Sequence, residues 1–382
     1  MCYIKADLFR RRYLSSPSNL PEFSTSTISQ EVHRMNHYPL RILLAVVFAA
    51  GALAAGCAFD QGASGLDSVI PAGAKLEKVT GDISFDTAGS PCWFKGALYF
   101  TNNNFDDLEK SRVMRMEKPG DIRVIRANNG MTATLKPNKA GNLYACEMMG
   151  HRVIEMDTSG RVLRTVVGEY NGKRIDGPND MALDARGGFY FTDSQFIGKQ
   201  EKMQDKPAVY YVIPDSVKMI QVWMKKDTIK DLGWKIIFNI LRVVDDVAFP
   251  NGVAFSPDEK VLYLANTQGK YLLAYDVVKG GTLANRRNFA VLDLSKENIA
   301  KKSEMSGADG VATDSKGNVY VVTTQGLGVQ VFDRSGKHLG NIPCPAPTNN
   351  CAFGGPDMKT LYVSAKDGIY RIPVKNAGFR NF

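Results

Sequence analysis

Four polar side chains recur at one place in a repeated pattern, and their chemical types suit the binding of a metal ion. Asn179, Asn251, Asp309 and Asn350 each lie 11 or 12 residues before a tyrosine. Carboxylate and amide oxygens are the ligands that hard cations such as Ca²⁺ prefer. If the four residues begin equivalent strands, their oxygens converge. The sequence then predicts a hard-cation site where these strands start.

The tyrosines belong to a repeat that predicts the fold. An apolar residue followed by tyrosine recurs six times, each time after a turn with Gly, Asp or Pro: Leu98-Tyr99, Leu143-Tyr144, Phe189-Tyr190, Leu262-Tyr263, Val319-Tyr320 and Leu361-Tyr362. Successive tyrosines of these pairs are 45, 46, 73, 57 and 42 residues apart. A repeat of roughly 40–50 residues is typical of a β-propeller with one four-stranded blade per repeat. We therefore expect an all-β, six-bladed β-propeller.

The stretch 172–194 shows the repeated unit most clearly. A polar cluster, Gly177-Pro178-Asn179-Asp180, precedes two short apolar runs that are separated by a Gly-containing turn. This pattern predicts a tight hairpin of two strands. If the first run is the innermost strand of its blade, the polar residues lie at one mouth of the central channel. A propeller must also close its ring, so we expect a strand near 76–79 to complete the last blade.

The 73-residue interval contains an insertion. The segment between Asp215 and Asp246 is about 25 residues longer than the repeat needs. Its apolar residues fall at helical spacing: Ile229, Leu232, Ile236, Ile237, Ile240 and Leu241. This spacing predicts an amphipathic helix within residues 215–245, packed on the blade rim. A lid over the channel mouth or a contact with a membrane surface are the alternatives.

The start of the chain predicts export. Residues 1–34 are polar, basic and patternless, and are expected to be an extension of the gene model or disordered. Residues 35–57 have the basic and apolar regions of a signal peptide and end in a sequence like a bacterial lipobox at Cys57. Residues 58–75 are expected to be a linker and 76–382 the propeller. The predicted location is the bacterial cell envelope, anchored to the membrane by a lipid on Cys57, or the periplasm or exterior after ordinary cleavage.

The net charge and the cysteines give little information about function. The net charge is +9, but residues 1–57 contain six Lys or Arg and three Asp or Glu, and the remaining charges are interspersed. No basic stripe suggests nucleic acid, so no nucleic-acid partner is expected. Cys344 and Cys351 flank a Pro-rich loop and could form a disulfide in an exported protein, with buried free thiols as the alternative.

Short motifs in order along the chain resemble the gluconolactonase family, which includes regucalcin. They are Ala145-Cys146-Glu147, Tyr170-Asn171-Gly172-Lys173-Arg174, Gly177-Pro178-Asn179-Asp180, Phe191-Thr192-Asp193, Phe249-Pro250-Asn251-Gly252, Ala308-Asp309-Gly310 and Cys351-Ala352-Phe353-Gly354-Gly355. The resemblance covers roughly residues 76–382 and implies a six-bladed lactone hydrolase with one divalent metal ion at the channel mouth. It implies that Asn251 and Asp309 are metal ligands, and that Asn179 is a ligand or a substrate contact. Calcium is the first candidate, with zinc, manganese and magnesium as alternatives.

Blade one departs from the family pattern. The family usually has a Glu ligand there, in a Glu-Gly-Pro-x-Trp motif, whereas this chain has Gly89 in the corresponding place, followed by Ser-Pro-Cys-Trp. Asp86, three residues earlier, is the nearest other carboxylate. Loss of an anionic ligand should weaken metal binding, because ligand charge tunes affinity.

The first functional hypothesis is a metal-dependent hydrolase that opens a sugar lactone. The ion would polarise the lactone carbonyl and lower the pKa of a bound water, and Asp309 would act as the general base. Asn129, Glu147 and Asn350 would contact substrate hydroxyls, although Glu147 could equally be a salt-bridged edge residue. The absence of a Gly-x-Ser-x-Gly motif argues against acyl-enzyme chemistry.

Two other hypotheses remain open at this stage. One is a non-catalytic, envelope-anchored propeller that binds a ligand or a protein partner, which the Gly89 departure favours. The other is a propeller arylesterase or a strictosidine-synthase-like protein. Because propellers serve many functions, the fold alone does not decide between them.

Overall fold

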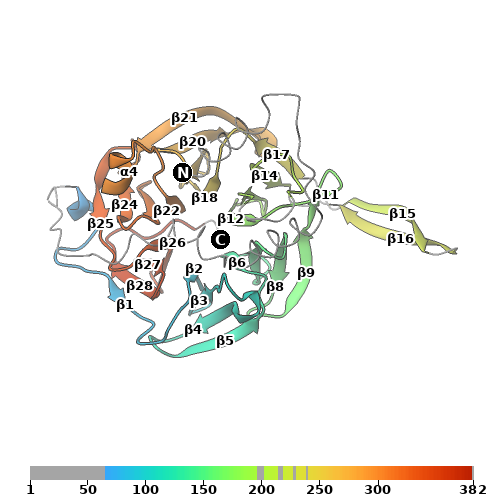
Figure 1. Ribbon diagram of the computed structural model, residues 1–382, viewed down its shortest axis with the longest axis horizontal. Helices are drawn as coiled ribbons and strands as arrows, with labels where there is room; N and C mark the ends of the chain where they lie inside the picture. The colour runs from blue at the N-terminus through green and yellow to red at the C-terminus, as the bar shows by residue number, and fades with distance from the viewer. Residues whose placement is uncertain (1–64, 196–201, 214–217, 227–228, 238–239, 381–382) are drawn as a thin grey trace, which may run out of the picture. The chain divides into compact units, whose positions relative to one another are not determined.

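The computed structural model describes residues 65–195, 202–213, 218–226, 229–237 and 240–380. Six four-stranded antiparallel sheets follow one another along the chain and are arranged as blades around a central channel (Figure 1). The predicted all-β, six-bladed propeller is confirmed. The leader, with its signal peptide and Cys57, lies outside the described residues. No helix in the described part of the chain is long and apolar enough to cross a membrane.

Each blade is numbered from its innermost strand outwards. Blade one contains β2 (Ala88–Phe94), β3 (Ala97–Asn102), β4 (Arg112–Met116) and β5 (Ile122–Ala127). Blade two contains β6 (Thr132–Pro137), β7 (Leu143–Glu147), β8 (Arg152–Met156) and β9 (Val162–Val167). Blade three contains β12 (Pro178–Leu183), β13 (Phe189–Asp193), β14 (Ala208–Val212) and β17 (Ile240–Val244). Blade four contains β18 (Pro250–Phe255), β19 (Val261–Asn266), β20 (Tyr271–Val277) and β21 (Leu283–Val291).

Blade five contains β22 (Ala308–Thr313), β23 (Val319–Thr323), β24 (Gly328–Phe332) and β25 (His338–Ile342). Blade six contains β26 (Thr348–Gly354), β27 (Thr360–Ala365), β28 (Gly368–Pro373) and β1 (Glu77–Lys78). A small sheet of β10 (Glu169–Tyr170) and β11 (Lys173–Arg174) precedes blade three. The helical elements of the described chain are short turns: η1 (Leu66–Ser68), η2 (Leu108–Lys110), η3 (Lys279–Gly281) and α4 (Lys296–Ala300).

The innermost strands β2, β6, β12, β18, β22 and β26 contact one another in sequence around the channel (Figure 1). Each forms a hairpin with the second strand of its blade, which carries the repeated tyrosine. The predicted hairpin unit is therefore confirmed. Most of these tyrosines are buried between blades, and Tyr99, Tyr190 and Tyr320 are completely buried. Burial of these large rings stabilises the packing of neighbouring blades.

The ring closes as expected, by a strand from before the first blade. β1 pairs antiparallel with β28, with Glu77 opposite Arg371 and Lys78 opposite Tyr370. The packed part of the chain also begins earlier than residue 76. Val69 and Ile70 are buried in an apolar cluster with residues of blades five and six, so part of the expected linker contributes to the core.

The insertion is not helical, and this prediction was wrong. β15 (Lys218–Lys226) and β16 (Ile229–Ile237) form an antiparallel two-stranded sheet that pairs with no other strand of the described chain (Figure 1). Residues 218–237 contain four Ile, two Trp and one Val. These residue types favour strands, and spacing alone cannot separate strand from helix in short apolar runs. Ile240 and Leu241 instead belong to β17, the outermost strand of blade three. A role as a lid or membrane contact stays a prediction.

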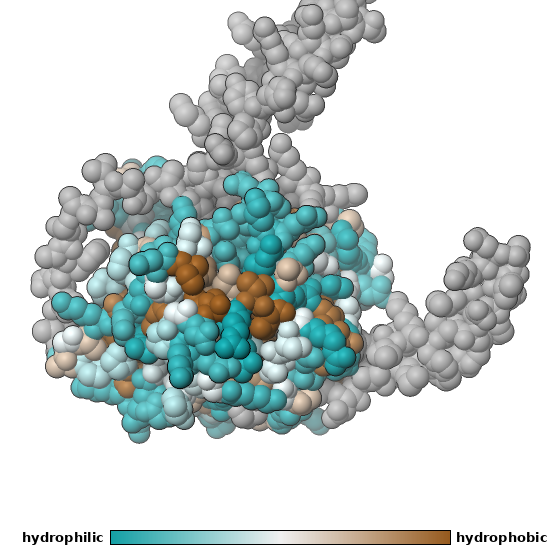
Figure 2. Space-filling model, turned by 90° about the horizontal axis from the view of Figure 1, so that it is seen from below, coloured by the Kyte–Doolittle hydropathy of each residue, from teal (hydrophilic) through white to brown (hydrophobic). Residues whose placement is uncertain are grey.

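The face shown in Figure 2 is largely hydrophilic, with several apolar residues near its middle. On the outer strands β5 and β9, Val124, Val162 and Leu163 are exposed. Single exposed apolar residues are usual in folded proteins and need no partner to explain them.

Candidate functional site

Strand register identifies six equivalent positions at one mouth of the channel. In every blade, one residue of the innermost strand pairs with the repeated tyrosine: Cys92, Lys136, Ala182, Ala254, Ala312 and Ala352. The residue three positions earlier is the second residue of the strand and lies within or at the edge of a β-bulge. These residues, which we call the rim, are Gly89, Ala133, Asn179, Asn251, Asp309 and Asn349. Four consecutive blades, three to six, thus present an amide or a carboxylate.

The rim is partly accessible to solvent. Asn179, Asp309 and Asn349 are partly exposed, whereas Asn251 is only 5% exposed. The residues that follow the six rim positions are all buried: Ser90, Thr134, Asp180, Gly252, Gly310 and Asn350. The polar arc of blades three to six therefore borders solvent on one side and a closed layer of the channel on the other.

The structure brings together three of the predicted site residues. The Asn179 side-chain amide donates a hydrogen bond of 2.9 Å to Oδ1 of Asn251. The Asn251 amide nitrogen donates to Oγ1 of Thr267 at 3.0 Å, and the Asn251 side chain lies close enough to the Asp309 carboxyl to lower its pKa. Ser194 lies 3.4 Å from the Asn179 amide nitrogen. Asn179, Asn251 and Asp309 form one connected group across blades three, four and five.

The environment of Asp309 makes its negative charge costly. Burial raises the pKa of the Asp309 carboxyl well above its ordinary range, and the Asp180 carboxylate nearby adds to this rise. The neighbouring Asn251 amide opposes it. Desolvation and a like charge both favour the protonated form of a carboxyl group.

Asp180 lies one level deeper and joins three blades. Its carboxylate accepts hydrogen bonds from Oγ1 of Thr134 at 2.8 Å and from the Val253 backbone N–H at 3.1 Å. Nζ of Lys136 lies 3.9 Å from the same carboxylate. Because Asp180 is buried and its oxygens are occupied by blades two and four, it is a support of the site.

In blade six the rim residue is Asn349, not the predicted Asn350. Asn350 lies one level deeper, is 8% exposed, and its Oδ1 accepts the Cys351 backbone N–H at 2.8 Å. Asn349 lies 13 residues before Tyr362, because the loop of the blade-six hairpin is longer. Counting back from the tyrosine therefore missed it. Two adjacent asparagines at this point were the available signal.

Asn129 and Glu147 lie in a buried network near the start of blade two. The Glu147 carboxylate, 1% exposed, forms ion pairs with Arg126 and, at 2.6 Å, with Nε of Arg152. The Asn129 amide donates to Oδ1 of Asn103 at 3.4 Å and accepts the Thr132 N–H at 3.3 Å. The ion pairs agree with the salt-bridge alternative for Glu147. Contact of either residue with a substrate stays a prediction.

Gly89 leaves a small space at the rim of blade one. A Cβ added at this residue would lie 3.0 Å from Oγ1 of Thr101 and 3.8 Å from Oδ1 of Asn349. Asp86, the nearest other carboxylate in sequence, is exposed and lies 3.5 Å from the Asn102 amide nitrogen. Its described contact is thus with the end of β3.

Two buried carboxylates hold the loop that carries Asn179. Asp193 accepts the N–H groups of Asp176 at 2.9 Å and of Gly177 at 2.7 Å. Asp176 accepts the backbone N–H groups of Met203 and Gln204 at 2.7 and 3.0 Å. Burial raises the pKa of Asp193 to about 6, despite these hydrogen bonds. The Gly-Pro-Asn turn is therefore fixed by its own blade, since Asp193 ends β13.

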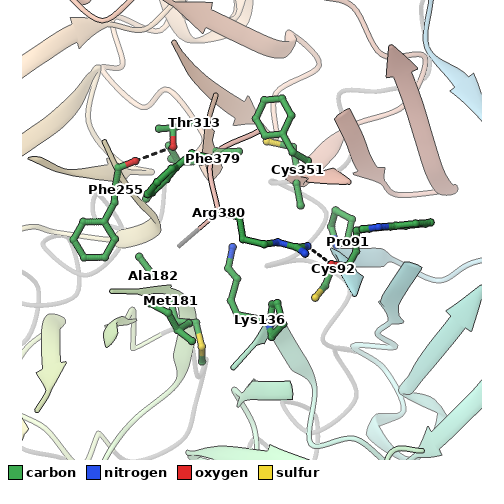
Figure 3. Close-up of a pocket in the computed structure, with 18 of the residues that line it drawn as sticks. Pro91, Cys92, Lys136, Met181, Ala182, Phe255, Thr313, Cys351, Phe379 and Arg380 are labelled. Atoms are coloured by element: carbon green, nitrogen blue, oxygen red, sulfur yellow. Dashed lines mark hydrogen bonds between the residues drawn. The ribbon is translucent and has the colours of Figure 1, made fainter. Parts of the chain in front are cut away.

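A cavity of about 150 Å³ lies at the other end of the channel (Figure 3). It is lined by the later residues of the innermost strands, among them Ala182, Thr313 and Cys351, and the side chains of Lys136 and Arg380 extend into it. The backbone N–H of Phe379 donates to the Thr313 carbonyl at 2.9 Å. The C-terminal segment thus narrows this end, so the rim and the cavity are separate regions.

The donors at the rim fit a hard divalent cation. In the described part of the chain, no three His, Cys, Asp or Glu side chains group closely enough to hold a metal. The rim instead offers amide oxygens and the single carboxylate of Asp309. Oxygen donors of this kind suit Ca²⁺ and similar ions, and their low total charge predicts modest affinity.

Comparison with known proteins identifies the family of the chain. Residues 87–367 match the family described as the SMP-30/gluconolactonase/LRE-like region. The chain belongs to this family. It is 24% identical over 346 residues to a gluconolactonase of Zymomonas mobilis. The aligned region covers 82% of this chain and 85% of the relative.

Solved structures of the family superpose on the propeller. A gluconolactonase of Xanthomonas campestris matches with a TM-score of 0.65 and 25% identity, over 81% of this chain and 92% of that one. A calcium-binding protein, regucalcin, of Agrobacterium tumefaciens matches with a TM-score of 0.58 and 17% identity, over 79% and 97%. At that identity the second likeness shows the fold alone. The membership expected from the short motifs is confirmed.

Proposed function

We propose that this protein is a metal-dependent hydrolase that opens sugar lactones. The observation that carries the proposal is the connected group Asn179–Asn251–Asp309 at the open mouth of the channel. The gluconolactonases of Zymomonas mobilis and Xanthomonas campestris, to which the chain is similar, support lactones as the substrate class.

Asn251 and Asp309 would hold the ion, with Asn179 as a further ligand or a substrate contact. A divalent cation held there would withdraw electron density from a lactone carbonyl. Asp309 would accept the proton of the attacking water, because it is the carboxylate at the rim and a bound cation would favour its ionised form. The neighbouring Asn251 amide favours the ionised form of this carboxyl. Cleavage of the bond between the carbonyl carbon and the ring oxygen would then return this proton from Asp309 to the leaving oxygen, and the product is the hydroxy acid.

The substrate would lie over blades one and two. At the rim, these blades have only Gly89 and Ala133, whereas the other four have longer polar side chains. The missing side chains leave room beside the polar arc. A sugar ring has several hydroxyls, which the amide oxygen of Asn179 can bind.

Calcium is the proposed ion, with zinc, manganese or magnesium as alternatives. Amide and carboxylate oxygens favour Ca²⁺ over soft metals. The likeness in fold to a regucalcin described as calcium-binding supports this choice.

The proposed location is the bacterial cell envelope, through a lipid on Cys57. The supporting observation is the apolar run ending in Ala-Gly-Cys at residues 55–57. Mass spectrometry of the mature N-terminus tests this. A lipid-modified Cys57 is expected. An unmodified N-terminus at another residue would instead support ordinary secretion, and an intact leader would contradict export.

The function is tested with the full chain after treatment with chelator. Calcium is titrated by calorimetry, and opening of gluconolactone is followed by pH-stat, with an aryl ester as the control substrate. Calcium-restored lactone hydrolysis above the spontaneous rate is expected, and Asp309→Ala should abolish both calcium binding and turnover. A fully active Asp309→Ala variant would contradict the proposal.

The Gly89 position also supports a second candidate, a non-catalytic propeller that binds a ligand. Here the rim would bind a sugar acid or lactone without turnover, because blade one lacks the family's carboxylate. The same experiment separates the two candidates. Binding of gluconolactone without hydrolysis at saturating calcium would favour the second.

A further inference from the structure

We propose that Asn349 is a further ligand of the ion at the rim. Its amide oxygen would bind the ion next to Gly89, the position at which blade one has no side chain. The inference rests on the proposed function and extends it to a residue of blade six. It makes the polar arc of Asn179, Asn251, Asp309 and Asn349 one continuous binding surface.

Strand register places Asn349 with the other three. Each of the four residues lies three positions before the alanine that pairs with its blade's tyrosine. Blades five and six are neighbours, since β22 and β26 contact each other. Asn349 is therefore the next rim side chain after Asp309. Like Asp309, it is partly exposed.

The hydrogen bonds of Asn349 orient its oxygen. Nδ2 donates to the Ala88 backbone carbonyl at 2.6 Å, which ties blade six to blade one. The amide nitrogen is thereby used, and Oδ1 lies 3.8 Å from the point where a Gly89 Cβ would be. Oδ1 also accepts the Ser364 hydroxyl. Because a carbonyl oxygen has two lone pairs, it can accept this bond and still offer a lone pair to a cation.

The Asn349 oxygen of blade six thus replaces, in part, the ligand that blade one lacks at Gly89. A side chain at residue 89 would project toward Oδ1 of Asn349, so the two positions border the same space. Because residue 89 is glycine, the space next to it is bordered by the side chain of Asn349. A neutral amide replaces a carboxylate, so the ligand set has a single negative charge and weaker affinity.

A purely structural role for Asn349 predicts a different outcome. Its bond to Ala88 could simply brace blades six and one. Asn349→Asp separates the two roles, because aspartate keeps an oxygen at the rim and adds charge, but cannot donate to the Ala88 carbonyl. A ligand role predicts tighter calcium binding in a less stable protein. A bracing role predicts lower stability without tighter binding.

The test measures calcium binding to the full, chelator-treated chain by calorimetry, together with the melting temperature without calcium. Asn349→Ala should weaken binding about tenfold, and Asn349→Asp should tighten it about tenfold, since ligand charge tunes affinity. Asn103→Ala is the matched control. It removes a similar 2.8 Å amide bond, to the Thr132 carbonyl between blades one and two, without removing a rim oxygen.

The outcomes distinguish this inference from the proposed function. If the wild type binds calcium, Asp309→Ala does not, and Asn349→Ala binds as the wild type does, the Asn349 inference fails and the proposed function stands. Weaker calcium binding by Asn349→Asp would also overturn the inference. If the wild type binds no divalent ion, the proposed metal site fails, and the inference with it.

Discussion

The side-chain amide of Asn179 donates a 2.9 Å hydrogen bond to Oδ1 of Asn251, from blade three to blade four. The two residues are 72 positions apart in sequence and occupy the same register position in their blades. The bond brings the side chains of Asn179 and Asn251 into contact at the rim. It uses one lone pair of the Asn251 oxygen, and the second lone pair remains for an ion.

We expect Asn251→Ala to weaken calcium binding about tenfold, because it removes one of few ligand oxygens. Turnover at saturating calcium should fall less, since Asp309 remains as the base. Calorimetry and pH-stat kinetics measure the two effects. Thr267→Val is the matched control: it removes the 3.0 Å partner of the Asn251 amide and leaves the oxygen in place. Equal calcium affinity in Asn251→Ala and the wild type would exclude Asn251 as a ligand.

Gly89→Glu should tighten calcium binding about tenfold, because it adds a carboxylate to a ligand set of low charge. Its backbone is not in the left-handed region, so a side chain is tolerated. Oγ1 of Thr101, 3.0 Å from the new Cβ, must move by a few tenths of an ångström. Gly89→Ala is the control, since it adds the Cβ without the charge. Unchanged affinity in Gly89→Glu would show that blade one does not border the ion.

Glu147→Gln should destabilise the fold by about 3 kcal/mol, because it leaves the charges of Arg126 and Arg152 without their buried partner. Urea denaturation measures the loss. The matched control is Glu155→Gln in the same blade, which removes a buried carboxylate 2.7 Å from Arg164. A rise in KM for lactone in Glu147→Gln alone would show that Glu147 also contacts the substrate.

The buried thiols should make the fold sensitive to alkali. Burial raises the pKa of Cys92 and Cys351 from 9.0 to about 12. The folded state therefore keeps these protons above pH 9, where the unfolded chain loses them, and stability falls as the pH rises. The linkage amounts to about 1.4 kcal/mol for each thiol at pH 10. Denaturation at pH 8 and pH 10 measures it.

A double variant, Cys92→Ala/Cys351→Ala, serves as the comparison for this effect. It should lose less stability between the two pH values than the wild type does, whatever its stability at pH 8. An equal loss in both proteins would refute the assignment to the thiols.

The four described cysteines, Cys92, Cys146, Cys344 and Cys351, are free in the structure, so the disulfide alternative for the last two is not realised.

The fold was predictable because its cause is local. Each blade repeats a hairpin whose strands, turn and buried tyrosine lie within a short stretch, so the number of blades can be read along the chain. Asn179, Asn251 and Asp309 lie at the start of such hairpins. Their convergence follows once the strands are arranged around a ring, and this part of the candidate site was predictable as well.

The insertion was not predictable in the same way. Apolar residues in a short Ile- and Val-rich run satisfy helical and strand spacing alike. Pairing between strands decides the structure of this segment. Val222 lies opposite Gly233 in the β15–β16 hairpin. Ile240 and Leu241 pair with β14 and complete blade three. Pairing partners are a property of the folded chain.

By itself, the sequence determined the repeat, the ring of six blades and the residue types at its mouth, because short-range spacing and side-chain chemistry decide these. Only the tertiary structure decided that Asn349, rather than Asn350, belongs to the rim, since a longer hairpin loop shifts the register of blade six. It also decided that Glu147 lies between two arginines. Such contacts join residues from different strands, and packing of the strands, rather than spacing along the chain, brings them together.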